Sequence, residues 1–291
     1  MNGILLIDKE QGMTSRDVVN HVSRKFNINK VGHTGTLDPL ATGVMVICIG
    51  KATKLVDILQ STTKEYIAGG VLGILTDTLD ITGKVLKEDN RIINKECLNE
   101  VLSSMIGTYE QEVPIYSAVK VKGRKLYEYA RNNEEVELPK RKVEIKEIEL
   151  LEYKICDNRV HFIIRVVVSK GTYIRSLIND IASKLNTIGT MTSLIRTKQG
   201  IFDINECYKL SDINQDNYKI LSIREALKDI PFIKVNSKLE NDINNGKILL
   251  DEYGYDKIGF INKDGKEIGI YQKDGLYIRP WKMLLINKES D

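Results

Sequence analysis

Hydrophobic residues follow the period of a β-strand in the middle of the chain. Within residues 158–169, apolar side chains occupy every second position: Val160, Phe162, Ile164, Val166 and Val168. Such alternation places one set of side chains on a single face of a strand. Residues 143–153 form a second strand-like segment, and the polar pair Asp157-Asn158 separates the two. The pattern therefore predicts two long strands joined by a tight turn.

Apolar residues spaced as in a helix occur in three other segments. Ser15 is expected to cap a helix that ends near Phe26, in which apolar residues recur every fourth position. Asn94 is expected to cap a second helix that ends near Gly107. The apolar stripe of residues 173–185 predicts a third helix, whose stripe packs into the core.

Two short apolar runs, residues 4–7 and 44–49, predict buried strands in the first part of the chain. Long strands mixed irregularly with helices indicate an α+β sheet, not a repeating βαβ array. A domain boundary is expected near residues 229–231, which gives domains of 1–229 and 230–291. Beyond it, short β-like pieces are separated by two Lys-Asp-Gly turns.

Composition narrows the class of protein without identifying a partner. Hydrophobic residues make up 42% of the chain and charged residues 29%, which is typical of a soluble globular protein. The net charge of +3 is too small to indicate nucleic-acid binding. The four cysteines form no closely spaced pair, which favours a reducing compartment and disfavours a zinc site or a disulfide framework. No apolar run reaches the ~18 residues of a membrane span, so we expect a cytoplasmic, soluble protein.

The glycine-rich segment 32–43, Gly-His-Thr-Gly-Thr-Leu-Asp-Pro-Leu-Ala-Thr-Gly, is the leading candidate for a functional loop. Asp38 precedes Pro39, which disfavours helix, and a buried strand follows at once, so the carboxylate is presented on a loop rooted in the core. The alternative is a tight turn whose aspartate caps backbone amides. A phosphate-binding loop is excluded, because Ala52 follows Gly50-Lys51 where serine or threonine is needed.

A second candidate region lies between residues 118 and 131, where basic and aromatic residues interleave. Lys120, Lys122 and Arg124 are followed by Tyr127 and Tyr129. Such a pattern suits contacts with a phosphate backbone and with exposed bases. A solvated amphipathic face is the alternative interpretation.

Four sequence blocks together resemble one known family. They are residues 32–43, 64–83, 113–120 and 170–177, and they occur in family order within roughly residues 3–200. The chain is similar to the TruB class of tRNA pseudouridine-55 synthases. An ordered set of motifs is far more specific than any single one. The resemblance implies a mixed, largely antiparallel sheet with flanking helices and a central catalytic cleft, followed by a small PUA-like β-domain.

The resemblance also implies site residues. Asp38 matches the catalytic aspartate, Tyr66 the aromatic that stacks on the flipped base, and Arg175 the arginine that pairs with Asp38 and with Asp80. An arginine can bind a carboxylate through two parallel hydrogen bonds, while a carboxylate can add to the base, attack C1′ or remove a sugar proton. Residues implied to contact the substrate or the RNA are His33, Tyr173, Leu194, Lys64, Lys120, Lys122, Arg124 and Arg196.

Residues 114–142 match a family insertion that closes over the tRNA arm, so we expect this segment to be disordered without RNA. The chain departs from the family pattern at Glu10 and Ile115, where prolines are usual, and at Ile195, which replaces an arginine. Residues 76–80 could also be read as a calcium loop, but Leu79 and Ile81 stand where oxygen ligands are required.

The implied activity is isomerisation of uridine to pseudouridine at position 55 in the T-arm of tRNA, with no cofactor and no metal. The implied partner is tRNA, with no guide RNA, no obligate protein partner and no membrane, and the chain is expected to be a monomer. Two alternatives stay open: an RNA-folding chaperone with vestigial catalysis, and a glycoside hydrolase with two carboxylates. The C-terminal domain is either an RNA-binding domain or an inert stabilising cap.

Overall fold

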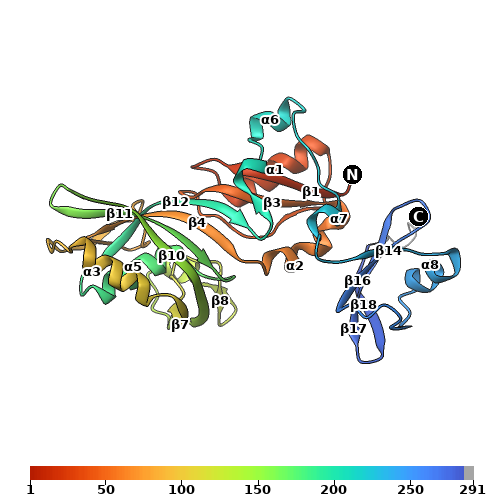
Figure 1. Cartoon of the computed structure of the whole chain (residues 1–291). Helices are drawn as coiled ribbons and strands as arrows, with labels where there is room; N and C mark the ends of the chain where they lie inside the picture. The colour runs from red at the N-terminus through yellow and green to blue at the C-terminus, as the bar shows by residue number, and fades with distance from the viewer. Residues whose placement is uncertain (285–291) are drawn as a thin grey trace.

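The computed structural model describes residues 1–284 and builds them around two main sheets (Figure 1). The larger has nine strands, and its order is β1 (Gly3–Lys9), β3 (Thr42–Ile49), β12 (Gly189–Gln199), β4 (Lys64–Leu72), β11 (Arg159–Val168), β10 (Lys140–Cys156) and β7 (Gly107–Glu112), with β2 (Val31–His33) on β3 and β13 (Phe202–Asp203) on β12. All of these pairs are antiparallel except β12 with β3. The expected mixed, largely antiparallel sheet is confirmed.

The parallel contact of β12 with β3 joins the two halves of this sheet. It consists of the pairs Ile195 with Thr42 and Arg196 with Gly43. Gly43 has φ +99°, and a Cβ atom there would lie 2.3 Å from the Arg196 carbonyl oxygen. Only glycine allows so close an approach in this conformation. The loop that precedes β3 therefore lies at the centre of the sheet.

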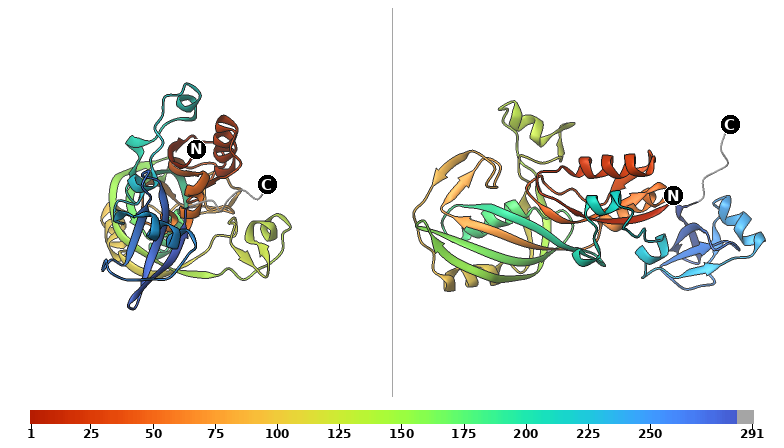
Figure 2. Two further views of the ribbon diagram at one scale, coloured as in Figure 1. Left: turned by 90° about the vertical axis from the view of Figure 1, so that its right-hand side faces the viewer. Right: turned by 90° about the horizontal axis from the view of Figure 1, so that it is seen from above.

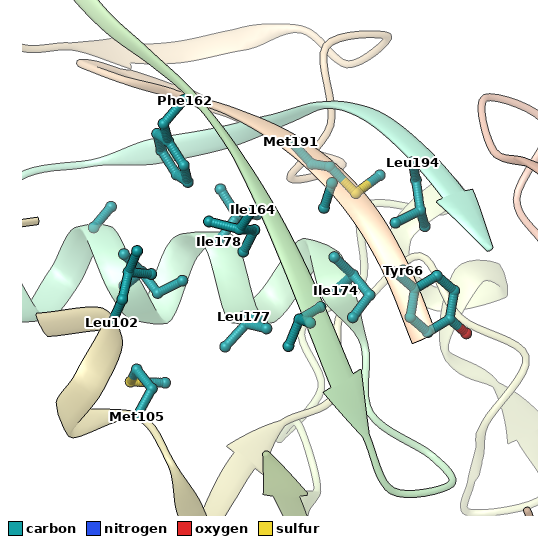
Figure 3. Packing of buried hydrophobic residues seen from close by; sticks show 14 of the residues in the cluster. Tyr66, Leu102, Met105, Phe162, Ile164, Ile174, Leu177, Ile178, Met191 and Leu194 are labelled. Carbon is teal, nitrogen blue, oxygen red and sulfur yellow. The ribbon is translucent and has the colours of Figure 1, made fainter. Parts of the chain in front are cut away.

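The two long strands predicted from the alternating pattern are β10 and β11, and Asp157 and Asn158 form the turn. Both turn residues have positive φ, 51° and 57°, as a tight hairpin turn requires. The buried side of β11 packs on helices α3 (Lys95–Ser104) and α5 (Ile174–Lys184). Figure 3 shows this core, in which Phe162 and Ile164 face Ile178 and Leu177.

The helix predicted to begin at Ser15 is α1 (Ser15–Phe26), but its cap is Thr14. Thr14 Oγ1 accepts from the Asp17 amide and Asp17 Oδ2 accepts from the Thr14 amide, which makes a reciprocal capping box. Ser15 is instead buried against the loop before β3. The Asn94 cap of α3 is confirmed, and that helix ends at Ser104, before Gly107.

The segment expected to be disordered is folded in the structure. It contains a hairpin of β8 (Lys120–Val121) and β9 (Arg124–Lys125), followed by α4 (Leu126–Arg131). Leu126 and Tyr129 are buried, and the Tyr129 hydroxyl donates to the Val121 carbonyl. These contacts hold the hairpin and the helix of the segment together. Figure 2 shows the hairpin and α4 projecting from the main sheet.

Short elements complete the first part of the chain. They are η1 (Gly50–Leu55), α2 (Val56–Gln60), β5 (Ile74–Thr76), β6 (Val85–Glu88), η2 (Ile204–Glu206), α6 (Leu210–Asn214) and α7 (Ile223–Ala226). Strands β5 and β6 pair with each other outside the large sheet. Within residues 1–284, no helix combines the length and the apolar character that crossing a membrane requires.

The second sheet begins directly after the boundary expected near residues 229–231. Its order is β14 (Phe232–Lys234), β16 (Lys257–Ile261), β17 (Glu267–Asp274), β18 (Tyr277–Met283) and β15 (Leu249–Leu250), with α8 (Ser237–Asn244) packed on it. It touches the first part of the chain through α2 and η1. Lys282 Nζ lies 2.7 Å from Asp57 Oδ2, and Lys54 Nζ donates to the Met283 carbonyl oxygen. Figure 1 shows the two sheets side by side along the molecule.

Candidate active site

A cavity of about 780 Å³ opens where the two halves of the large sheet meet. Its wall combines segments that are far apart in sequence: the loop 35–38, strand β4, residues 116–118, the start of β10, the start of α5 and the middle of β12. Its size suits a nucleoside with part of its backbone. The wall also carries Asp38, Tyr66 and Arg175.

Asp38 projects from a loop that is fixed on both sides. The Ser15 hydroxyl donates to the Leu37 carbonyl and accepts from the Leu37 amide, at 3.1 and 2.9 Å. After the aspartate, the Ala41 amide donates to the Asp38 carbonyl and the Gly12 amide to the Pro39 carbonyl. The backbone is therefore rigid, while the Asp38 side chain is 37% exposed and faces the cavity.

Arg175 lies in the first turn of α5 and contacts several segments that form the site. Its side chain is only 5% exposed. Its Nε lies 2.9 Å from Asp38 Oδ2 and 4.0 Å from Asp80 Oδ2. Its Nη1 donates to the Thr78 carbonyl and its Nη2 to the Tyr116 carbonyl. The two-bond pairing that an arginine can form with one carboxylate is absent here. The guanidinium instead ties three chain segments together, which a planar fork with several donors can do.

Asp80 is the buried partner of this guanidinium. Its Oδ1 accepts hydrogen bonds from the Thr82 amide, the Thr82 hydroxyl and the Thr78 hydroxyl. The backbone on either side is fixed by Met191 of β12, whose amide donates to Leu79 and whose carbonyl accepts from Ile81. Asp80 Oδ2 is thus left to face the arginine, and Asp80 is buried and is not among the residues that line the cavity.

Tyr66 supplies an aromatic surface beside Asp38. It lies on β4, is 6% exposed and pairs in register with Val166 and Arg196. Figure 3 shows its ring beside Ile174 and Leu194, with the hydroxyl directed away from the apolar cluster. Tyr66, Leu194 and Tyr173 all line the cavity. Together they form an apolar shelf on which a planar base can stack.

Lys64 and Arg196 are buried at the rear of the cavity. Lys64 Nζ donates to the carbonyls of Gln60 and Thr62, at 3.0 and 2.9 Å. Burial lowers the pKa of Lys64 to about 8, and the nearby charges of Arg196 and Lys170 act in the same direction. Arg196 is 1% exposed, and its guanidinium donates to the Val44 carbonyl and the Gly35 carbonyl. These hydrogen bonds hold the loop that carries Asp38. The family resemblance had instead implied that Arg196 contacts RNA.

Sequence reasoning missed several cations at this cavity. Arg141, Lys142 and Lys170 line it, and none of them has a carboxylate within 4 Å among residues 1–284. Lys9 is also buried nearby: burial lowers its pKa, which the charge of Asp38 opposes. Positive charges without carboxylate partners favour an anionic ligand. The basic run Lys140–Lys142 was the available signal, but its position next to the cavity depends on sheet pairing.

The remaining candidates do not line the cavity. His33 lies on β2, and its buried Nδ1 has no hydrogen-bond partner in the part of the chain that the structure describes. Burial, with the charges of Arg196 and Arg16, lowers the pKa of His33. Lys120 and Lys122 are exposed on the β8–β9 hairpin. Arg124 is paired with Glu134. Within residues 1–284, no group of three or more His, Cys, Asp or Glu is arranged to hold a metal ion.

Comparison with known proteins gives the family. The model of the TruB family pseudouridylate synthase (N terminal domain) matches residues 23–174. The chain belongs to the TruB family. It is 41% identical to tRNA pseudouridine synthase B of Caldanaerobacter subterraneus subsp. tengcongensis, covering 97% of this chain and 99% of the relative. It is 42% identical to tRNA pseudouridine synthase B of Lactobacillus acidophilus, covering 99% of this chain and 100% of the relative.

A solved structure has the same fold at lower sequence identity. An H/ACA RNP bound to a substrate RNA containing 2′-deoxyuridine contains a chain that matches with a TM-score of 0.71 and 21% identity. The match covers 98% of the TruB-family chain described here and 86% of the other. Because it extends through the second sheet, both sheets belong to the shared fold.

Proposed function

We propose that this chain is a tRNA pseudouridine synthase that isomerises uridine to pseudouridine at position 55 in the T-arm. One observation carries the proposal. A half-exposed carboxylate, Asp38, is held 2.9 Å from a buried guanidinium, Arg175, in a cavity that also presents an aromatic shelf. The guanidinium also ties chain segments together, but that role does not require a partly exposed carboxylate facing a cavity, and ionisable groups arranged in this way in a cleft are typical of a functional site.

The reaction breaks the N1–C1′ bond of uridine, rotates the base and joins C5 to C1′, so no external reagent is consumed. The uridine first leaves the stacked RNA, which costs a few kcal/mol. Stacking on Tyr66 returns about 1–3 kcal/mol of this. Leu194 and Tyr173 exclude water from the other sides of the base.

Asp38 supplies the reactive group. Its carboxylate adds to the base, attacks C1′ or removes a sugar proton, and each of these steps leads to cleavage of the glycosidic bond. Arg175 orients this carboxylate and offsets its charge during desolvation by the substrate. Asp80 keeps the guanidinium in place from the other side. After C5 joins C1′, the C5 proton is removed and the freed ring nitrogen takes up a proton from water, so the proton count is unchanged. Tyr66 lines the cavity and is the candidate for taking the C5 proton, as its own phenolic proton passes to water.

The arrangement of domains supports a wider proposal about RNA binding. Residues 1–229 form the catalytic domain, with residues 114–142 as an RNA-binding insertion, and residues 230–291 form a PUA-like RNA-binding domain. Of that second domain the structure describes residues up to 284. We propose that the chain acts in the cytoplasm as a monomer, without a guide RNA or a protein partner. Ile270 and Leu284 of the second part pack in one apolar cluster with Leu55 and Leu59, which supports a fixed relation between the second sheet and the catalytic domain.

Unmodified tRNA transcript tests this function directly. Purified protein is incubated with the transcript, and pseudouridine is mapped by carbodiimide modification followed by reverse-transcription stops. We expect one new stop, in the T-arm, with wild-type protein and none with Asp38→Asn, which should still bind the transcript. RNA binding by the wild type without any new stop would contradict the proposal and favour the chaperone alternative. Release of free uracil would indicate glycoside hydrolysis.

A further inference from the structure

Gln111 is a fully buried polar residue next to the site, and no role is assigned to it above. It lies near the end of β7 and is 1% exposed. Its Oε1 accepts from the Tyr173 amide at 2.7 Å, and its Nε2 donates to the Tyr173 carbonyl at 3.1 Å. The side-chain amide thus pairs with both backbone groups of one residue, as a neighbouring peptide group in a sheet does.

This pairing fixes the backbone of the residue from which α5 begins. Tyr173 is the N-cap of α5, and its own side chain makes no capping hydrogen bond. Three residues further on, the Ser176 hydroxyl donates to the Glu112 carbonyl, also on β7. Strand β7 therefore holds the first turn of α5 on both sides of Arg175. The position of the guanidinium depends on these contacts, because α5 delivers it from its first turn.

The orientation of the Gln111 amide is itself fixed. Its second Nε2 hydrogen bond goes to the Tyr109 hydroxyl at 2.8 Å, and that hydroxyl donates to Asp180 Oδ2 at 2.9 Å. A flipped amide would present its oxygen to the Tyr173 carbonyl and its NH₂ group to the Tyr173 amide. Both contacts would then be repulsive. The chain from Asp180 through Tyr109 leaves one orientation, the one that holds Tyr173.

We propose that Gln111 is a positioning residue that sets Arg175 in the first turn of α5 against Asp38. The inference rests on the proposed function. A shift of about 1 Å at a catalytic group lowers the rate about 10²-fold, while binding of the RNA, which has many other contacts, changes little. The kcat value therefore depends on Gln111 far more than KM does.

Gln111→Glu tests the hydrogen-bond pattern at nearly constant volume. The ionised carboxylate presents only lone pairs to the Tyr173 carbonyl and to Tyr109, whereas the protonated acid restores one donor. The groups around it are Tyr109 and Glu112 on its own strand, Asp180 from α5, and Arg141, its register partner on β10. Burial raises the pKa of a carboxyl at this position.

We expect kcat of Gln111→Glu to be about 10²-fold below wild type at pH 8, with KM within threefold, and the ratio to wild type to recover as the pH falls to 6. Glu110→Gln, an exposed change on the same strand, is the matched control and should keep wild-type kcat at every pH. Thermal unfolding of each variant shows whether it is folded.

Gln111→Met covers the case in which Gln111→Glu does not fold. It keeps the volume without a charge, and we expect a lower kcat, an unchanged KM and no recovery at low pH. Wild-type kcat in Gln111→Met, or a Gln111→Glu ratio that is independent of pH, would overturn the inference while leaving the proposed function intact. A wild-type protein that forms no pseudouridine would overturn the proposed function and this inference together.

Discussion

The Arg175 site and the β8–α4 segment both carry paired arginines, but the pairs are held in opposite ways. Arg175 is 5% exposed, and three segments of the chain converge on it. Arg124 lies in an exposed pair with Glu134: its Nη1 and Nη2 atoms are 2.8 and 3.1 Å from the two carboxylate oxygens. The Arg175 pair is fixed by backbone carbonyls, which cannot move independently. The Arg124 pair is formed by two side chains in water and breaks easily.

The buried Arg175 pair and the exposed Arg124 pair are suited to different tasks, one in the reaction and one in RNA binding. Under the proposed function, Arg175 must keep its geometry when the substrate displaces water, and it is held by backbone carbonyls and by Asp80. A group that captures RNA must release its partner and turn toward a phosphate, so an exposed pair serves better. Changes at the Arg175 site should therefore lower kcat, and changes at the β8–α4 segment should alter affinity and its salt dependence.

Asp38→Asn should have the largest effect. The amide keeps the shape of the side chain but has no charge to act as a nucleophile or a base, so we expect kcat to fall by at least about 10³-fold. Binding of the transcript should stay within threefold of wild type, because the loop is held by Ser15 and Arg196. Single-turnover assays and filter binding measure the two quantities. A variant with a tenth of wild-type activity would remove Asp38 from the chemistry.

Arg175→Lys should have the next largest effect, a loss of about 10² in kcat. One ammonium group cannot reach Asp38 and also satisfy the carbonyls of Thr78 and Tyr116. Single-turnover rates at saturating enzyme measure the effect. Arg124→Lys is the matched control on the exposed side, and its kcat should stay at the wild-type value. Equal losses in the two variants would remove the distinction between the two regions.

Local pattern was enough to predict the elements whose contacts are local. The β10–β11 hairpin follows from alternation and from Asp157-Asn158 in the turn. The cap of α1 was placed at Ser15 although the capping box of Thr14 and Asp17 was visible in the sequence. Ser15 does not cap the helix: its hydroxyl bonds to the Leu37 backbone, and that contact depends on the tertiary fold.

The residues of the site also fall into those that a local pattern predicts and those whose position depends on the tertiary fold. The Asp38 loop could be predicted from one continuous segment, because its glycines and proline indicate a turn and an apolar strand follows directly. Gln111 carries no local signal, since its position beside Tyr173 depends on the pairing of β7 with β10. Lys170 lies in the block 170–177, but the pattern of that block does not show that its side chain lines the cavity. The disorder expected for the β8–α4 segment rested on the family insertion that residues 114–142 match. The burial of Leu126 and Tyr129, which orders the segment, depends on how the segment folds back on itself.

Lys64 offers a smaller effect that depends on pH. Its pKa of about 8 means that the free enzyme loses this positive charge as the pH rises from 7 to 9. A bound phosphate favours the protonated form, so the affinity for RNA should fall over this range, by about fivefold for an interaction of ~1 kcal/mol. Lys64→Arg keeps the charge throughout and should show a flatter profile. The same slope in both proteins would exclude Lys64 as the titrating group.

The smallest effect is expected at the β8–α4 segment, and it has a definite sign. Arg124→Ala should weaken RNA binding only a few-fold, because it removes a single phosphate contact. The slope of log affinity against log salt concentration should fall by about one at most. Glu134→Gln should do the opposite, because it releases Arg124 from its carboxylate and leaves the guanidinium free for a phosphate. Neither change should alter the single-turnover rate at saturating enzyme. Binding titrations from low to moderate salt measure both variants. Weaker binding by Glu134→Gln would mean that the ion pair supports the fold of the segment, and that its exposed charges are not what captures the RNA.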